Sequence, residues 1–151
     1  MEDESKKAKL RALRILTKMD KTESDLKASL NRAGFSEKAV QDALEYVKSF
    51  GYVDDQRYAE KYVEYNKDRK SRQKIRYELK NKGVHSDYIE WALENCEEFD
   101  ELSLIRKTVA KKWKSEEKPN EKELNRLFGC LSRQGFSSRD IWQVLREENL
   151  T

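Results

Sequence analysis

The sequence predicts an all-α fold, an elongated tandem array of three three-helix repeats with about nine helices and no strands. Three observations lead to this prediction. One apolar pattern recurs three times along the chain, glycines stand where helices must end, and no window shows the period-two alternation of a half-buried strand. Tandem copies of one helical module, each packed on its neighbours, are typical of helical repeat proteins.

The recurring unit is 19 residues long and has apolar residues four positions apart on both sides of a glycine. The first copy begins at Leu26, and the three glycines, Gly34, Gly83 and Gly135, are 49 and 52 residues apart. Apolar residues four apart share one face of a helix. We therefore expect a flexible N-terminus and three repeats, over residues 1–7, 8–51, 52–99 and 100–151.

Each glycine follows a helix at the point where the backbone turns left-handed, a conformation that costs a residue with a Cβ about 1–2 kcal/mol. Counting back from Gly34, Leu30 and Phe35 are the two residues that touch in a Schellman cap. The same count pairs Leu79 with Val84, Leu131 with Phe136, and Val47 with Tyr52. We interpret four glycines as structural caps: Gly34, Gly51, Gly83 and Gly135.

Helix starts are marked by capping residues. Ser36 and Ser137 follow their glycine turns as N-caps, and in the second copy we expect the cap to pass from His85 to Ser86. Thr22-x-x-Asp25 and Asn120-x-x-Glu123 resemble capping boxes. The expected helices span residues 8–19, 22–33, 36–50, 55–69, 71–82, 86–98, 100–114, 120–134 and 137–149.

Composition limits the size of any single core. The chain is 36% hydrophobic and 40% charged, so each unit of about 50 residues must bury apolar surface against its neighbours. Such a high charge content also fits disorder, but the regular apolar spacing and the caps argue against that alternative.

The sequence indicates neither an exported protein nor an enzyme. Its N-terminus has no apolar stretch typical of a signal peptide, and no segment approaches the length of a membrane span. Cys96 and Cys130 lack metal-ligand spacing, and both are interpreted as small apolar residues of the core or its edge. Phosphate-loop, nucleophile-elbow and zinc-protease motifs are missing. We expect a cytoplasmic monomer without catalytic residues, metal or cofactor.

Charge is unevenly distributed although the net charge is only +3. Residues 67–82 contain eight basic side chains, and a second basic run surrounds Trp113; the acidic residues Glu94, Glu97, Glu98, Asp100 and Glu101 lie between them. Basic clusters of this kind favour a phosphate-bearing or acidic partner. The expected contact residues for a filament or a nucleic acid are Arg57, Lys67, Arg69, Lys70, Arg72, Lys74, Arg76, Tyr77, Lys80, Lys111 and Lys112.

The helix expected over 71–82 carries the most informative part of this surface. Ile75 and Leu79 define its buried direction, and Tyr77 points the opposite way between Lys74 and Lys80. An exposed tyrosine among cations suits an anionic partner. A solvated face on which Tyr77 packs against the next repeat fits equally well. Arg72, Arg76 and Lys80 are expected to form a stripe along this helix.

Other aromatic residues have more than one interpretation. Trp91 and Trp142 occupy different positions in their copies, so they lie outside the shared core pattern. Each could seal a junction between repeats or anchor a partner, and we favour the junction. Tyr58, Tyr62 and Tyr65 are spaced as one helical stripe, which we interpret as an inward face.

Two segments in combination resemble the signature of the RecX family. They are GYVDDQRYAEKYV, residues 51–63, and KIRYELKNKGV, residues 74–84; the third repeat adds LSRQGFS, residues 131–137, and Ile141. The resemblance covers residues 10–150. Ser71 departs from the family pattern, where glycine is frequent, as does Gln134, where arginine is usual.

Membership of this family would imply a cytoplasmic bacterial regulator of RecA, built from three-helix repeats. Such proteins bind RecA–DNA filaments and modulate, usually inhibit, their activities in recombination, DNA repair and the SOS response. Single- or double-stranded DNA would be bound weakly and without sequence specificity, in keeping with phosphate contacts from the basic runs.

Two alternatives belong to other functional classes. Each glycine turn joins two helices much as in a helix-turn-helix, so a sequence-specific DNA-binding protein is one alternative. Only the last helix offers base-reading side chains near its start, Arg139 and Gln143. A generic helical scaffold for binding other proteins is the second alternative.

Overall fold

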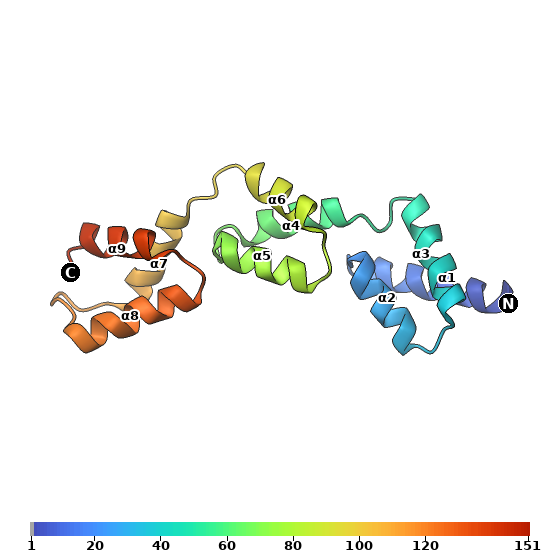
Figure 1. The fold of residues 1–151 in the computed structure, drawn as a ribbon, viewed down its shortest axis with the longest axis horizontal. Helices are drawn as coiled ribbons and strands as arrows, with labels where there is room; N and C mark the ends of the chain where they lie inside the picture. The colour runs from blue at the N-terminus through green and yellow to red at the C-terminus, as the bar shows by residue number, and fades with distance from the viewer. Residues whose placement is uncertain (1) are drawn as a thin grey trace. The chain divides into compact units, whose positions relative to one another are not determined.

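The computed structural model describes residues 2–151 and contains, over that range, nine helices and no strand (Figure 1). This confirms the all-α prediction. The helices are α1 (Glu2–Lys18), α2 (Glu23–Arg32), α3 (Glu37–Ser49), α4 (Asp55–Asn66), α5 (Arg72–Asn81), α6 (Ser86–Glu94), α7 (Glu101–Lys112), α8 (Glu121–Arg133) and α9 (Ser138–Glu147).

Internal contacts divide the chain into two compact units. The first comprises residues 1–62 and 78–95, and the second comprises residues 63–77 and 96–151. The division falls within α4 and α5.

The first helix begins earlier than the sequence predicts. α1 begins at Glu2, whereas the sequence predicted a flexible segment over 1–7 and a helix from residue 8. Polar side chains of the first turns are held by α3 and its N-cap: Ser5 Oγ donates to Asp42 Oδ2 at 2.7 Å, and Glu4 Oε1 accepts the Ser36 N–H at 2.6 Å. These hydrogen bonds stabilise the helical conformation of a polar segment. The sequence prediction missed this segment because it relied on apolar periodicity. Met1 lies outside the described residues.

Two helices end earlier than predicted. α4 ends at Asn66, whose carbonyl accepts the N–H groups of Arg69 and Lys70 in a tight turn. α6 ends at Glu94, and Glu98 has a positive φ of 61°, which a continuing helix does not allow.

In the first unit, α1, α2 and α3 pack around a shared apolar core. Leu26 and Leu30 of α2 and Val47 of α3 are fully buried there. Phe35, directly after Gly34, packs against this core as a partly buried residue. The apolar positions of the repeated unit are therefore the core positions of the helix group.

In the second unit, α7, α8 and α9 form an equivalent group around Ile105, Leu131 and Ile141, all fully buried. Trp142 packs against this core and lies 4.9 Å from Phe128 between ring centroids. The junction role expected for Trp142 is therefore wrong, because its contacts lie within the third repeat. Trp91 is 47% exposed.

The glycine turns have the geometry of left-handed caps. Gly34, Gly51, Gly83 and Gly135 have φ values of 90°, 72°, 84° and 95°. After Gly83, the Val84 N–H donates to the Leu79 carbonyl at 3.1 Å, the long bond of a Schellman motif. The next helix is capped by His85, whose Nδ1 accepts the Asp87 N–H at 3.1 Å. The prediction that the cap passes to Ser86 is therefore wrong.

A buried hydroxyl at the start of the second helix of a repeat binds the following repeat. In the first unit, the fully buried Thr22 accepts the Asp25 N–H and donates to the Lys82 carbonyl at 2.7 Å. Beside it, the Glu23 N–H donates to Asp55 Oδ1 at 2.9 Å. One side chain thus caps α2 and satisfies a carbonyl next to the Gly83 turn.

The second unit repeats this arrangement with other residues. Ser71, also fully buried, accepts the Lys74 N–H and donates to the Gln134 carbonyl at 2.7 Å, and the Arg72 N–H donates to a Glu101 carboxylate oxygen. Ser71 departs from the family pattern, yet its side chain is buried in this contact and takes no part in the basic surface.

Candidate functional site

The basic residues expected to contact a partner fall into two groups, those held by contacts within the protein and those that extend into solvent. Arg57 belongs to the first group. Its Nη1 donates to the Gly51 carbonyl at 3.0 Å, so its guanidinium satisfies the backbone at the end of α3. Arg57 therefore has a structural contact that its place in the sequence did not reveal.

Lys67 is also held within the protein. Its Nζ lies 2.7 Å from Glu64 Oε1 and donates to the Glu97 carbonyl at 3.2 Å, and only 14% of its side chain is exposed. The hydrogen bond with Glu64 raises the pKa of Lys67, and the same bond lowers the pKa of Glu64. Lys67 therefore joins the end of α4 to the segment after α6.

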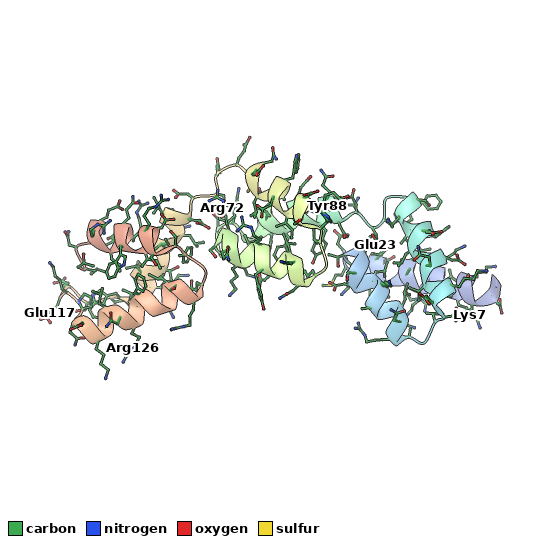
Figure 2. The ribbon with its side chains drawn as sticks, in the orientation of Figure 1. Lys7, Glu23, Arg72, Tyr88, Glu117 and Arg126 are labelled. Atoms are coloured by element: carbon green, nitrogen blue, oxygen red, sulfur yellow. The ribbon has the colours of Figure 1, made fainter. Side chains whose placement is uncertain are left out.

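Arg72, which is labelled in Figure 2, is also held within the protein. Its guanidinium lies 4.4 Å from the centroid of the Phe99 ring, and Nη2 donates to the Phe99 carbonyl at 3.1 Å. A cation over an aromatic face is stabilised when water is excluded, and Phe99 is buried. Arg72, the first member of the expected stripe of Arg72, Arg76 and Lys80, is therefore engaged within the protein, while Lys80 is exposed. Arg76 also has an internal contact, from Nη1 to Gln73 Oε1 at 3.1 Å.

The tyrosine stripe of α4 does not form a single inward face. Tyr62 is half-buried and donates to Glu78 Oε1 at 2.8 Å, and burial together with this bond raises its pKa. Tyr58 stacks on Tyr62 at 6.1 Å between ring centroids. Tyr65 is 65% exposed, so its predicted burial is wrong. The Arg69 guanidinium lies 4.4 Å from the centre of the Tyr65 ring.

The outer side of α5 carries the exposed part of the predicted set. Lys74 and Lys80 are exposed, and Tyr77 between them is 65% exposed. The alternative in which Tyr77 packs against the next repeat is therefore wrong. We call Lys74, Tyr77 and Lys80 the α5 face. Lys111 and Lys112 are exposed on α7, while Lys70 is half-buried at the turn before α5.

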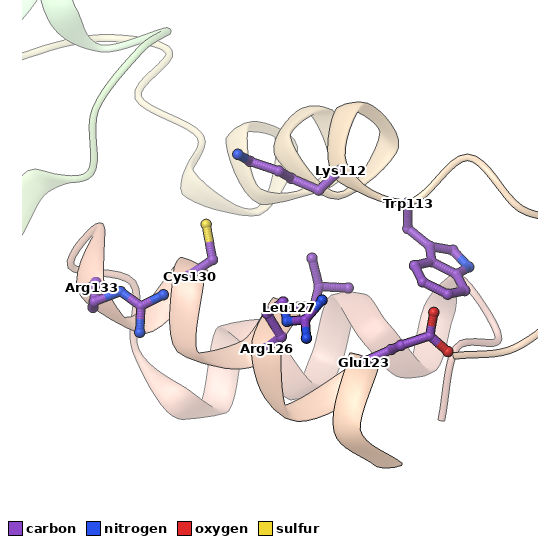
Figure 3. Close-up of a pocket in the computed structure, with 7 residues that line it drawn as sticks. All are labelled: Lys112, Trp113, Glu123, Arg126, Leu127, Cys130 and Arg133. Carbon is purple, nitrogen blue, oxygen red and sulfur yellow. The ribbon is translucent and has the colours of Figure 1, made fainter. Parts of the chain in front are cut away.

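A pocket of about 320 Å³ lies beside α7 and α8 (Figure 3). Sequence reasoning placed only Lys112 of this group in the contact set. An alignment of the repeats could have pointed to α8 as a second contact surface. In that alignment Arg126 and Gly129 occupy the positions of Lys74 and Tyr77. The pocket is lined by Lys112, Trp113, Glu123, Arg126, Leu127, Cys130 and Arg133.

The side chains suggested for major-groove reading are paired with carboxylates close by in the sequence. Arg139 Nε lies 3.6 Å from Asp140 Oδ1, and Gln143 Nε2 donates to Glu147 Oε1 at 3.1 Å. Gln143 and Arg106 hold the pKa of Glu147 below its usual range. A Gln143 amide held in this way does not favour base reading by α9.

Among residues 2–151, no three histidine, cysteine or acidic side chains gather as a metal site. Burial, followed by the nearby Glu64 carboxylate, raises the pKa of the Cys96 thiol. Within the same range, no helix is both long and apolar enough to cross a bilayer.

Family models and relatives agree on one group of proteins. Residues 54–93 match the second three-helix domain of RecX, and residues 100–145 match the third. A regulatory protein RecX of Caldanaerobacter subterraneus subsp. tengcongensis is 36% identical over 150 residues, which cover 98% of this chain and 72% of that protein. A regulatory protein RecX of Clostridium perfringens is 34% identical over 139 residues, 90% of this chain and 66% of that protein. The chain thus spans about two thirds of the length of such relatives.

Solved structures show the same fold. A crystal structure of RecX from Lactobacillus salivarius has a TM-score of 0.84 and 19% identity, and the match covers all of both chains. A second crystal structure, of a regulatory protein RecX, has a TM-score of 0.83 and 27% identity over 94% of this chain and 73% of that one.

Proposed function

Because the chain belongs to the RecX family of regulatory proteins, we propose that it binds RecA–DNA filaments and modulates their recombinase activity, chiefly by inhibition. Its role is then in the control of recombination, DNA repair and the SOS response. The observation that carries this proposal is the 36% identity to a regulatory protein RecX over 98% of the chain. The regulator acts by binding alone, as a cytoplasmic monomer without a cofactor.

The α5 face supports a contact with an anionic partner. Lys74 and Lys80 lie three residues before and three residues after Tyr77, so each is about one helical turn from the ring. A filament on DNA offers phosphates and acidic side chains, and a tyrosine ring can stack on a guanidinium or a base. Lys111 and Lys112 on α7 add two exposed cations.

The residues that support this contact are fewer than the sequence predicted. Arg57, Lys67 and Arg72 are bound to backbone carbonyls of this chain, so we assign them to positioning rather than to contact. The proposed contact set is then the α5 face with Lys111 and Lys112. Lys74 and Tyr77 lie in the same compact unit as these two lysines.

Co-sedimentation tests the proposal directly. The protein is centrifuged with RecA assembled on single-stranded DNA, beside samples that lack RecA or lack DNA. We expect it in the pellet with the assembled filament and mostly in the supernatant of both controls. Sedimentation that is equal with and without RecA would contradict a filament partner and leave only DNA binding.

A further inference from the structure

The pocket beside α7 and α8 combines cations with an apolar floor. Lys112 reaches it from α7, while Arg126 and Arg133 reach it from α8. Leu127 and Cys130 form the apolar part of the lining, and the indole of Trp113 stands at one end (Figure 3). Trp113 is fixed there because its Nε1–H donates to the Glu117 carbonyl at 3.0 Å.

The glycine inside α8 makes room for one of these cations. Gly129 is the one glycine outside the cap pattern, and glycine is a poor residue for a helix interior. A Cβ at this position would lie 3.1 Å from Arg133 Nη1, so the Arg133 guanidinium lies close over Gly129. In α5 the equivalent position is held by Tyr77, so the site is particular to the third repeat.

The two ends of the pocket, which follow one another along α8, differ in their chemistry. Glu123 lies near the start of the helix and Arg133 at its end, about 15 Å apart by helical rise. In Figure 3, Trp113 and Glu123 stand at one end, and Lys112, Cys130 and Arg133 stand toward the other. One end therefore offers an aromatic surface beside a carboxylate, and the other offers two cations.

A nucleotide also has two chemically different ends. Its phosphate is anionic and accepts bidentate hydrogen bonds from guanidinium groups, and its base is planar and stacks on aromatic side chains. An acidic peptide fits less well, because Glu123 would face its carboxylates. Duplex DNA fits less well because its bases are stacked and paired.

We propose that this pocket is a nucleotide subsite for single-stranded nucleic acid, with phosphate at Arg133 and Lys112, a base at Trp113, and Arg126 between the two ends to contact the backbone. The inference deepens the proposed function and rests on it for the presence of a single strand in the bound filament. It assigns the single-strand contact to the third repeat and to residues outside the α5 face.

Fluorescence anisotropy with a labelled oligothymidylate of about 15 nucleotides, a length that spans typical single-strand sites, tests the proposal without RecA. The pocket variant carries Arg126→Glu and Arg133→Glu. The matched control carries Arg139→Glu and Arg146→Glu on exposed positions of α9 in the same repeat, with the same change of charge. We expect roughly tenfold weaker binding for the pocket variant, a salt slope lower by about 1.4, and much smaller changes for the control.

A charge-neutral variant separates geometry from general electrostatics. Gly129→Ala places a methyl group against the Arg133 guanidinium and favours the helix. We expect weaker oligothymidylate binding with undiminished helical content by circular dichroism. Unchanged binding in both Gly129→Ala and the pocket variant would overturn the proposal, as would equal losses in the pocket variant and the control.

Competitors distinguish the source of the ligand. We expect unlabelled oligothymidylate to displace the probe at far lower concentration than thymidine monophosphate, a duplex of equal length or a glutamate-rich peptide. Equal competition by any of these three would overturn the assignment to a single strand. Because RecA is absent from this assay, a negative result here leaves co-sedimentation with the filament unaffected, and the reverse also holds.

Discussion

Several of the predicted contact cations are also engaged by groups of this chain. Arg57, Lys67 and Arg72 each donate to a backbone carbonyl, and two of these carbonyls, Glu97 and Phe99, lie in the short segment between α6 and α7. Sequence spacing places a cation on a helix but does not show which loop passes beside it. The exposure of Lys74 and Tyr77 was predictable, because Ile75 and Leu79 fix the buried direction of α5.

Asp55 makes the folding stability depend on pH. Burial, as the largest cause, raises its pKa above the ordinary 3.8. The folded state therefore holds this proton more tightly than the unfolded chain does, and the resulting stability is present below pH 3.8 and lost as the pH rises through the raised pKa. Asp55→Asn keeps an oxygen that can accept the Glu23 N–H and removes the buried charge.

We expect Asp55→Asn to melt at neutral pH at a temperature no lower than the parent. Its stability should also fall less than that of the parent as the pH rises from about 4 to 6, the range just above the ordinary carboxyl pKa. Thermal melts at several pH values measure both effects. A variant that is clearly less stable at pH 7 would show that the Asp55 charge itself stabilises the contact with the Glu23 N–H.

Substituting alanine at two of the glycine turns should destabilise the protein by different amounts. Gly34 has a φ of 90° and open space where a Cβ would lie, so Gly34→Ala should cost about 1–2 kcal/mol from backbone strain alone. At Gly83 an added Cβ would also overlap the Ser24 Cβ. We expect Gly83→Ala to cost about 1–3 kcal/mol more than Gly34→Ala, as overpacking does. Denaturant unfolding checks the order, and equal costs would contradict the packing at Gly83.

At the scale of elements, the same junction is built twice with different residues. Thr22 and Ser71 each cap a helix and bind a carbonyl next to a glycine turn of the following repeat. The helices and their glycine turns were predictable because periodicity and capping chemistry are local. The junction was not predictable, because its partners lie 60 and 63 residues apart in the sequence.

Removing one junction hydroxyl should destabilise the protein more than losing an exposed cap. Thr22→Val keeps the side-chain shape but leaves the Asp25 N–H and the Lys82 carbonyl without this partner. We expect a loss of about 1–3 kcal/mol in the free energy of unfolding. Ser36→Ala, at an exposed N-cap of the same unit, is the control and should cost about 1 kcal/mol. Equal losses would mean that Thr22 acts only as a cap.

Equivalent helices of the repeats carry different surfaces. The outer side of α5 presents Lys74 and Tyr77, whereas the equivalent positions of α8 hold Arg126 and Gly129. A shared fold therefore does not imply a shared contact. The sequence alone pointed to the α5 face because a basic run surrounds it. The α8 pocket needed the structure, since its cations come from two helices.

For the whole molecule, a net charge of +3 spread over separate basic clusters predicts weak, nonspecific affinity for free DNA. Each phosphate contact contributes about −0.9 to the slope of log K against log salt on duplex DNA. We expect duplexes of unrelated sequence to bind equally and to be released by moderate salt, as measured by anisotropy. A preference for one duplex that survives high salt would instead favour the helix-turn-helix alternative.

We propose that exposed cations and an aromatic ring on α5 contribute to regulation of a RecA filament. The most direct measurement is the DNA-dependent ATPase of RecA in the presence of a variant with Lys74→Glu, Tyr77→Ala and Lys80→Glu. The control, Lys27→Glu with Lys38→Glu, makes the same change of charge at exposed positions of the first repeat. Circular dichroism should show equal helical content in all three proteins.

We expect the parent and the control to change the ATPase rate to a similar extent, and the α5 variant to have lost most of that effect. Its buried side, Ile75 and Leu79, is untouched, so a loss of effect reports contact rather than unfolding. If the α5 variant regulates RecA as well as the parent does, the claim is contradicted and the contact surface lies elsewhere, with Lys111 and Lys112 as the next residues to reverse.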